Sequence, residues 1–230
     1  RFHVVPQPGE ENFGTWGMNG WQDRRGPGIW TPVTVDPVND LVFFPLGNAT
    51  DQNFGNNRPG ENLYATSLLA LQASTGKRKW HFQVTHHDIY DWDLASPPAL
   101  IEAEKYGKKI PAVAQMTKLG FLFMFNRLTG EPIYPIEERK VPGSDVPGEQ
   151  SAPTQPYAAI PEPTVPDRFP GISRLADIAS FGECSRTLKK LRYDGRYTPP
   201  SLQGSVAYPS TAGGVEWGGG AVDPRSGVYV

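Results

Sequence analysis

The sequence predicts an all-β protein whose short strands form part of a β-propeller. Three features of the chain lead to this fold class: its composition, a repeated strand–turn–strand unit and a second repeated hairpin. The 230 residues include 25 glycines and 24 prolines, which interrupt any long helix, and 11% of the residues are aromatic. Frequent turn residues together with plentiful aromatic side chains are typical of short strands joined by turns.

The first repeated unit is "TVDPVNDLVFF", residues 34 to 44. It begins as a strand, turns at Asp36 and Pro37, and returns as a second strand of alternating and then continuous apolar residues. The stretch "AVDPRSGVYV", residues 221 to 230, repeats the same order of strand, Asp-Pro turn and strand. Each copy therefore predicts a β-hairpin.

The second repeated unit is an apolar strand that runs into a Gly turn and returns as another strand. It occurs as "LLALQASTGKRKWHF", residues 68 to 82, and as "FLFMFNRLTGEPIYP", residues 121 to 135. In each copy an aromatic residue follows the turn glycine by four positions: Gly76 with Trp80, and Gly130 with Tyr134. Recurrence at a spacing of about fifty residues indicates propeller blades. The alternative is two unrelated hairpins that share a common turn dipeptide.

Residues 140 to 200 interrupt this pattern and predict a long insertion between strands. Pro and small polar residues dominate 140–170, which predicts extended loop. In 172–195 apolar residues recur close to helical spacing, which predicts one or two short helices. We therefore expect one incomplete propeller domain over 1–230 with an insertion at 140–200. Such a loop serves either as a lid or wall over a site or as a surface excursion without a chemical role.

Charge and cysteine content argue against several classes of protein. The 22 basic and 24 acidic residues nearly balance, and basic blocks are short, such as the run of three at 77–79 and the pair Lys189 and Lys190. Neither a nucleic acid nor an anionic membrane is therefore an expected partner. The single cysteine, Cys184, excludes an internal disulfide and a CxxC metal site. No run of about 18 apolar residues occurs, so we expect no membrane-spanning helix.

The densest group of titratable side chains is "HFQVTHHDIYDWDL", residues 81 to 94, with three histidines and three aspartates. A carboxylate within reach of a substrate proton acts as a general base. Clustered Asp and His side chains also ligate metal ions. A third possibility is structural, with buried Asp and His side chains pairing with backbone amides at strand ends. The residue types and their spacing leave all three open.

The order of motifs along the chain resembles the quinoprotein dehydrogenases, propeller enzymes that use pyrroloquinoline quinone (PQQ). The run "HHDIYDWD" is similar to the HHD-x-x-D-x-D pattern of the glucose dehydrogenase type. Five matching features occur in the same order across nearly the whole chain: "GIWTPVTVDP", "PLGNATD", "ALQASTGKRKWHFQVTHHD", "TKLGFLFMFNRLTGEP" and "GGVEWGGGAVDP". The resemblance implies a propeller, in agreement with the repeats.

The resemblance implies a role for each matched residue. Trp30 stacks beneath the planar quinone and fixes its plane, and Asn48 supplies an amide oxygen to a divalent cation, usually calcium. Asp88 is the base that takes the substrate hydroxyl proton while hydride passes to PQQ. Lys118 hydrogen-bonds the quinone oxygens and stabilises the reduced form, and Trp217 lines the cofactor pocket. Without the resemblance, Trp30 would be expected in the core, Asn48 in a turn and Lys118 on the surface.

The remaining residues of the matched motifs have less defined roles. His86 and His87 orient Asp88 or line the substrate pocket, with a structural role expected for at least one of them. Asp91 and Asp93 are expected to bond backbone amides at the strand end. Glu216 stands where alcohol-oxidising relatives commonly have Asn, so the chain departs from the family pattern at that position.

The resemblance further implies a sugar or polyol substrate, a bacterial periplasmic location, and a quinone or cytochrome as electron acceptor, with any membrane anchor outside these residues. The repeats account for roughly four of about eight blades. We therefore expect an internal fragment whose missing blades complete the ring. An open half-ring exposes strand edges, so we expect the isolated chain to be inactive and to bind PQQ poorly. Two other functions remain open: a cofactor-free propeller scaffold of the bacterial envelope, and a metal-dependent hydrolase built on the His-Asp cluster.

Overall fold

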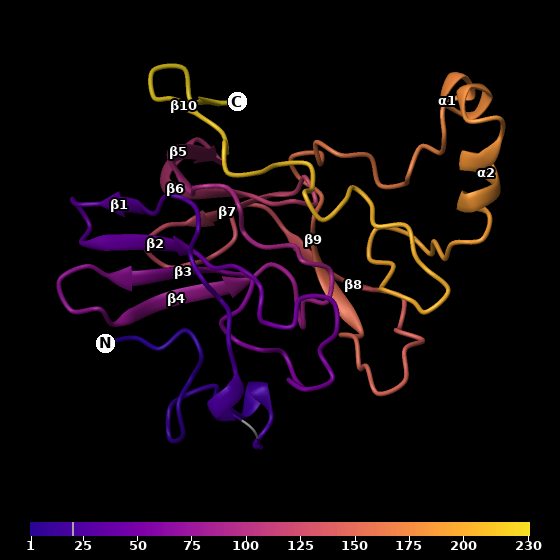
Figure 1. Cartoon of the computed structure of the whole chain (residues 1–230). Helices are drawn as coiled ribbons and strands as arrows, with labels where there is room; N and C mark the ends of the chain where they lie inside the picture. Colours follow the sequence, from indigo (N-terminus) through magenta and orange to yellow (C-terminus); the bar gives the residue numbers. More distant parts are fainter. Residues whose placement is uncertain (20) are drawn as a thin grey trace.

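The computed structural model of the chain describes residues 1–19 and 21–230, and its regular structure is mostly antiparallel β-strand (Figure 1). The four-stranded sheet consists of β1 (Thr34–Asp36), β2 (Leu41–Pro45), β3 (Ser67–Gln72) and β4 (Arg78–Gln83). The three-stranded sheet consists of β5 (Ala99–Lys105), β6 (Lys108–Met116) and β7 (Leu122–Asn126). Two hairpins follow, β8 (Ile136–Lys140) with β9 (Thr154–Ala158), and β10 (Val222–Asp223) with β11 (Val228–Tyr229). Two 3₁₀ helices, Phe13–Trp16 and Trp21–Asp23, precede β1.

The four-stranded sheet runs in chain order, as expected from two successive hairpins. Along β2, Leu41 and Phe43 are buried whereas Val42 and Phe44 are half-buried, the alternation of a strand with one face toward the core. In β3 the successive residues 67–70 are all buried, because Leu68 and Leu69 on its two faces pack into two different hydrophobic clusters. The predicted hairpins at 34–44 and 68–82 are therefore confirmed.

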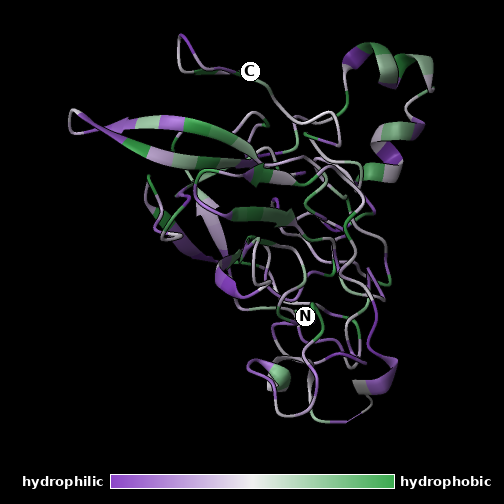
Figure 2. Ribbon diagram, turned by 90° about the vertical axis from the view of Figure 1, so that its left-hand side faces the viewer, coloured by the Kyte–Doolittle hydropathy of each residue, from purple (hydrophilic) through white to green (hydrophobic). Residues whose placement is uncertain are grey.

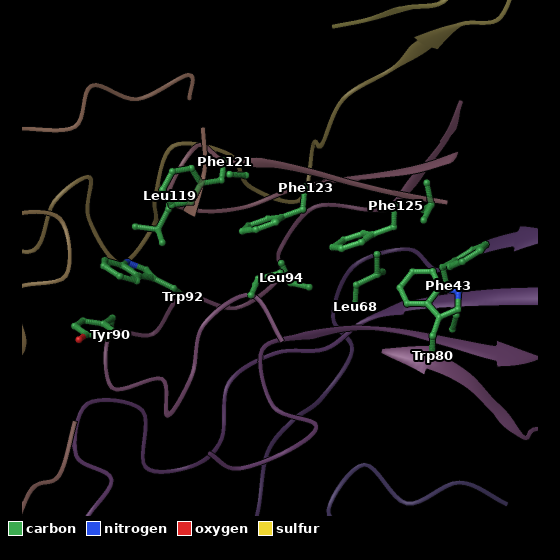
Figure 3. Packing of buried hydrophobic residues seen from close by; sticks show 14 of the residues in the cluster. Phe43, Leu68, Trp80, Tyr90, Trp92, Leu94, Leu119, Phe121, Phe123 and Phe125 are labelled. Carbon is green, nitrogen blue, oxygen red and sulfur yellow. The ribbon is translucent and has the colours of Figure 1, made fainter. Parts of the chain in front are cut away.

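The two larger sheets pack against each other, and aromatic side chains fill the space between them. Phe121, Phe123 and Phe125, at and just before β7, point into this layer, as Figure 3 shows. The rings of Trp80 and Phe82 lie 5.6 and 4.9 Å from that of Phe125, centroid to centroid. Residues two apart on a strand share a face, so the Phe-x-Phe-x-Phe pattern directs three rings into one layer.

A second, smaller core lies on the other side of the three-stranded sheet. Ala112, Ala114 and Ile133 are buried there, and Val222 and Tyr229 of the β10–β11 hairpin pack against this cluster. The three-stranded sheet is thus stacked between the four-stranded sheet and the last hairpin. Successive sheets stacked face to face are the arrangement of propeller blades, and in the described residues they do not close into a ring.

The glycine-turn repeats place equivalent aromatic residues between neighbouring sheets. Trp80 of the first copy donates a hydrogen bond from Nε1 to Arg127 O at 3.0 Å, and its ring lies against Gly130. Tyr134 of the second copy belongs to the same core as Val222 of the next hairpin. Each copy therefore joins one sheet to the next, which is the structural reason for the repeat.

Gly76→Ala and Gly130→Ala form a matched test of this packing. Both glycines have positive φ, +68° and +79°, so alanine costs about 1–2 kcal/mol of backbone strain at either position. At Gly130 the added Cβ would lie 2.7 Å from Cγ of Trp80, whereas at Gly76 no atom of a described residue would lie within 4 Å of it. Because overpacking adds about 1–3 kcal/mol, we expect the larger loss of unfolding free energy for Gly130→Ala in urea titrations. Equal losses would contradict the contact.

The β8–β9 hairpin lies partly in the segment 140–170, which the sequence predicts as extended loop. That prediction is wrong at β9. Gln155 gives the reason: it is fully buried, its side chain donates to His86 O and it accepts from His86 N, both at 2.7 Å. A partner far away in the sequence therefore holds this strand in place, and no local pattern of apolar residues predicts the strand.

The helices expected in 172–195 are present as α1 (Arg174–Ala179) and α2 (Glu183–Leu188). The Ser173 side chain caps α1 by accepting a hydrogen bond from Ala176 N at 3.2 Å. The pair is set apart from the sheets (Figure 1), carries hydrophobic segments (Figure 2) and buries none of its residues. Within the described residues, no helix has the length and apolar character needed to cross a membrane.

Candidate active site

Three loops at one end of the two larger sheets bring together the polar residues of the candidate site. They are the β2–β3 loop (46–66), the β4–β5 connection (84–98) and the β6–β7 loop (117–121). Asp93, in the β4–β5 connection, bonds to both of the other loops. Its Oδ1 accepts from Asn48 N at 2.5 Å, and its Oδ2 pairs with Lys118 Nζ at 3.0 Å. These contacts hold three distant segments of the chain in one place.

The Lys118 ammonium is buried beside an exposed indole. The Lys118 side chain is 5% exposed, and Nζ also donates to Asp91 O at 2.8 Å. The same nitrogen lies 5.7 Å from the ring centroid of Trp30, a residue that is 51% exposed. An ammonium at this distance is attracted to the electron-rich face of the indole. Trp30 and Lys118, which lie far apart in the sequence, thus form one surface with a flat apolar face and a fixed positive charge.

Asp91 places a carboxylate with an unused oxygen next to Lys118. Its backbone is left-handed, with a φ of 62°, and the residue is partly exposed. Oδ1 is buried, and no donor in the described part of the chain reaches it. Partial burial raises the pKa of Asp91, Lys118 opposes this shift, and the carboxylates of Asp93 and Glu216 add to it. A carboxylate with free acceptor capacity and a raised pKa is suited to take a proton from a bound ligand.

Asp88, the predicted base, is enclosed by its own loop. It is 1% exposed, its Oδ1 accepts from Tyr90 N at 2.8 Å, and its Oδ2 accepts from Trp92 N at 3.0 Å and from Thr66 Oγ1 at 2.9 Å. Burial raises the pKa of Asp88 to about 6, although the hydrogen bonds from Tyr90 and Thr66 oppose the shift. Both oxygens already accept hydrogen bonds from the protein, so the geometry argues against Asp88 as the group that removes a substrate proton.

The aspartates of "HHDIYDWD" therefore differ from expectation in what they contact. The backbone-amide bonds expected of Asp91 are made by Asp88 instead, and in the described residues Asp91 accepts none. Asp93 does accept one backbone amide, from Asn48, and in addition pairs with Lys118, which the sequence did not reveal. Asp88 therefore bonds the backbone of its own loop, whereas Asp91 and Asp93 lie next to Lys118.

His86 and His87 line a cavity of about 320 Å³ together with Glu138 and residues 150–154. His87 is 4% exposed and lies between Gly60 O, at 2.6 Å from Nδ1, and Glu149 Oε1, at 3.2 Å from Nε2. His86 is half-buried, with Nε2 3.1 Å from Glu138 Oε1. In the described residues neither imidazole bonds to the Asp88 carboxylate. A substrate role for His86 and His87 stays a prediction. Because the two imidazoles contact different carboxylates, their arrangement does not favour a hydrolytic metal centre.

The segment 213–217 runs along Lys118. Gly214 N donates to Lys118 O at 2.6 Å, and a Cβ on Gly213, where φ is +71°, would collide with the Lys118 side chain. Two residues later, Glu216 is close enough to raise the pKa of Asp91. Trp217 is 70% exposed. The predicted cofactor-lining segment therefore lies beside the candidate site, and the contact of Trp217 with a cofactor stays a prediction.

The whole chain, residues 1–230, matches the family described as "PQQ: Glucose/ethanol/alcohol dehydrogenase, beta-propeller domain". The chain belongs to this PQQ propeller family. It is 36% identical over 207 residues to the quinoprotein glucose dehydrogenase of Escherichia coli and 37% identical over 217 residues to quinoprotein glucose dehydrogenase A of Acinetobacter calcoaceticus, each over 90% of this chain. It is 34% identical over 221 residues, 92% of its length, to the glycerol dehydrogenase large subunit of Gluconobacter oxydans.

The alignments cover 26%, 27% and 29% of these relatives, so the chain spans little more than a quarter of their length. Among solved structures, a europium-containing methanol dehydrogenase matches 94% of the chain and 31% of its own, with a TM-score of 0.60 at 18% identity. The quinohemoprotein alcohol dehydrogenase from Comamonas testosteroni matches 89% of the chain and 25% of its own, with a TM-score of 0.55 at 22% identity. The predicted all-β, partial propeller and the resemblance to quinoprotein dehydrogenases are confirmed.

The residues at the candidate site fit PQQ, the cofactor of this family. PQQ is a planar, anionic quinone. Trp30 offers a flat face that is half exposed, and stacking on an indole fixes the plane of such a ring. Lys118 offers an ammonium held in place by Asp91 O and Asp93, and a charged donor binds quinone or carboxylate oxygens strongly. Oδ1 of Asp91, which accepts no hydrogen bond from a described residue, would be satisfied by a hydroxyl-bearing ligand.

Asn48 is buried, and its Oδ1 already accepts a hydrogen bond from Ala49 N at 2.6 Å. A carbonyl oxygen has a second lone pair, so Asn48 retains one position for a cation. Across residues 1–19 and 21–230, no group of three or more His, Cys, Asp or Glu side chains is arranged to hold a metal ion. Because calcium takes about six to eight oxygen ligands, a cation at Asn48 needs further donors.

Sequence reasoning missed Asp91, Asp93 and Gly213 as parts of the site. The residue types do not separate the aspartates, because any of the three could bond the backbone two residues further on, as Asp side chains commonly do in turns.

Proposed function

We propose that this chain forms part of a PQQ-dependent dehydrogenase that oxidises a hydroxyl group of a sugar or polyol, with Asp91 as the base. One observation carries the proposal: an exposed indole, a buried ammonium and a carboxylate with an unused oxygen lie together at one end of the stacked sheets. Trp30, Lys118 and Asp91 come from three separate segments of the chain. A convergence of this kind suits a planar anionic cofactor beside a hydroxyl-bearing substrate.

Trp30 and Lys118 would bind and orient the cofactor. Asp93 and the carbonyl of Asp91 hold the ammonium in place. Lys118 is therefore already ordered before the ligand binds, and its charge acts at a fixed point. When bound, PQQ supplies the acceptor for the hydride that leaves the carbinol carbon.

Asp91 would accept the proton of the substrate hydroxyl at its carboxylate. It must be ionised to do so, and the neighbouring ammonium of Lys118 favours that ionised form. The raised pKa of Asp91 makes its carboxylate a stronger base than an exposed aspartate. Activity therefore rises as the pH passes through the pKa of Asp91, since only the deprotonated form accepts the proton.

Calcium remains part of the proposal through Asn48, whose amide oxygen would be one of several ligands. A cation there would lie next to the Asp93 network, since Asn48 N donates to Asp93. Its contribution would be Lewis-acid polarisation of a cofactor oxygen.

The proposed substrate class rests on relatives named for glucose and glycerol oxidation. Sugars and polyols share a secondary or primary hydroxyl as the reacting group. We further propose that the full-length protein acts in the bacterial periplasm and passes electrons to a quinone or a cytochrome.

The test is reconstitution of the full-length protein, freed of cofactor, with PQQ and calcium. We expect dye-linked oxidation of glucose, glycerol or a related polyol only when PQQ is added, together with a change in the PQQ absorption spectrum on binding. Oxidation that is indifferent to PQQ would contradict the proposal. Failure to bind PQQ at all would instead support the cofactor-free scaffold.

Trp30→Ala is expected to weaken PQQ binding while leaving the fold intact. Aromatic stacking contributes about 0.5–1.5 kcal/mol beyond buried area, which is roughly two- to tenfold in Kd. Because Trp30 is 51% exposed and its ring faces Lys118, the free energy of unfolding should fall by about 1 kcal/mol, which is too little to unfold the protein. Trp30→Phe should restore part of the affinity, and Tyr106→Ala, at a 93% exposed turn residue, should leave Kd unchanged. Equal Kd values for Trp30→Ala and the wild type in PQQ titrations would refute stacking.

A further inference from the structure

The Asp88 carboxylate bonds to the backbone on both sides of Asp91. It accepts from the backbone N–H of Tyr90 at 2.8 Å and from that of Trp92 at 3.0 Å, the residues immediately before and after Asp91. One side chain thus fixes the peptide groups on both sides of the proposed base. Asp91 is left-handed, with a φ of 62°, a conformation that is uncommon outside glycine but that aspartate adopts more often than most residues.

The backbone of Asp91 is held from a third direction by Lys118. Nζ of Lys118 donates to Asp91 O at 2.8 Å and to Asp93 Oδ2 at 3.0 Å. Asp88 and Lys118 therefore both hold this short turn. Asp88 accepts from two of its N–H groups, and Lys118 donates to one of its carbonyl oxygens. With the peptide groups fixed in this way, the Asp91 carboxyl is the part of the turn left without a donor at Oδ1 in the described residues.

Asp88 is itself held by buried polar groups. Thr66 Oγ1, fully buried, donates to Asp88 Oδ2 at 2.9 Å. Arg58, also fully buried, donates from one terminal nitrogen to Asp88 O at 2.7 Å and to Asp51 O at 2.8 Å, and from the other to Asn62 Oδ1 at 2.6 Å. A guanidinium is costly to bury unless it is hydrogen-bonded. These bonds tie the turn rigidly to the β2–β3 loop.

We infer that Asp88 is a positioning residue for Asp91, and that Arg58 and Thr66 hold Asp88 in place for this purpose. The inference rests on the proposed function, since it takes Asp91 to be the base. It assigns the conspicuous "HHD" aspartate to the geometry of the turn and leaves the proton transfer to the aspartate three residues later. A carboxylate is needed because the two N–H groups and the Thr66 hydroxyl together require both of its oxygens as acceptors.

The test is Asp88→Asn in the full-length protein reconstituted with PQQ and calcium. Asparagine has nearly the same shape but only one acceptor oxygen, so either Tyr90 N or Trp92 N loses its partner. Because misplacing a reacting group by about 1 Å costs roughly a hundredfold in rate, we expect kcat to fall by about ten- to a hundredfold, with KM and the Kd of PQQ within about twofold of the wild type. Thr66→Val, which removes one donor but keeps both backbone bonds, should lower kcat less.

A double-mutant cycle with Asp91→Asn separates positioning from general support of the fold. If Asp88 acts through Asp91, Asp88→Asn has little further effect on kcat once Asp91 is Asn. Unchanged kcat in Asp88→Asn, with kcat strongly reduced in Asp91→Asn, would overturn the inference and leave the proposed function standing. Activity retained by Asp91→Asn would overturn the proposed function instead. Should Asp88→Asn fail to fold, the Thr66→Val cycle with Asp91→Asn decides: additive losses in kcat would overturn the inference.

Discussion

Asp91→Asn is expected to remove most of the turnover of the full-length protein without loss of the fold or of PQQ binding. The amide keeps the size of the side chain but cannot accept the substrate proton, and removal of a general base typically costs about 10²–10⁴-fold in kcat. Asp91 is partly exposed and accepts no bond from a described donor at Oδ1, so its replacement removes little that stabilises the protein. The measurement is dye-linked kcat at saturating PQQ, alongside the Kd of PQQ.

The neighbouring Asp88 provides the comparison for that experiment. With Asp91 as the base, Asp91→Asn loses more activity than Asp88→Asn, because a mispositioned base still accepts protons and an amide does not. The reverse order, with Asp88→Asn the more damaging variant and Asp91→Asn nearly as active as the wild type, would return the role of base to Asp88.

Lys118→Met is expected both to destabilise the protein and to abolish tight PQQ binding. The Lys118 and Asp93 side chains are 5% and 12% exposed and lie 3.0 Å apart. Removing one partner of a buried ion pair leaves an uncompensated charge and costs about 3–5 kcal/mol. The same change removes the ammonium that faces Trp30, so the Kd of PQQ should rise by more than that of Trp30→Ala. Urea titration and PQQ titration measure the two effects separately.

Two further variants separate the stability of the ion pair from binding. Lys109→Met removes an exposed lysine near the start of β6 and should change the free energy of unfolding by about 0.5 kcal/mol or less. In the double variant Lys118→Met with Asp93→Asn, the unpaired buried charge is gone, so stability should largely return while PQQ binding stays weak. Recovery of PQQ binding in the double variant would show that Lys118 serves the fold alone.

Much of the fold could be predicted because its signals are local. Gly76 and Gly130 mark tight turns, and the strands beside them are apolar and rich in aromatic residues. The hairpin β8–β9 could not be predicted, because Thr154–Ala158 carries Pro156 and the polar Gln155, whose burial depends on the backbone of His86. Tertiary contacts, and not intrinsic strand preference, decide such a segment.

The candidate site could be predicted only in part. The motifs predicted roles for Trp30, Asn48 and Lys118. In the structure Asn48 and Lys118 both contact Asp93, and Trp30 lies beside Lys118. The sequence could not separate three aspartates that share one short motif. Which of them bonds its own backbone and which faces the ligand depends on the path of the turn, and a left-handed φ at Asp91 is not readable from residue types.

The most direct measurement is a crystal structure of the full-length protein with PQQ bound. We expect the PQQ ring stacked on the indole of Trp30, a quinone or carboxylate oxygen within hydrogen-bond distance of Lys118 Nζ, and the Asp91 carboxylate facing the substrate side of the ring, with Asp88 still bonded to Tyr90 N and Trp92 N. Electron density for PQQ elsewhere, or an Asp91 side chain turned away from it, would contradict the proposed site.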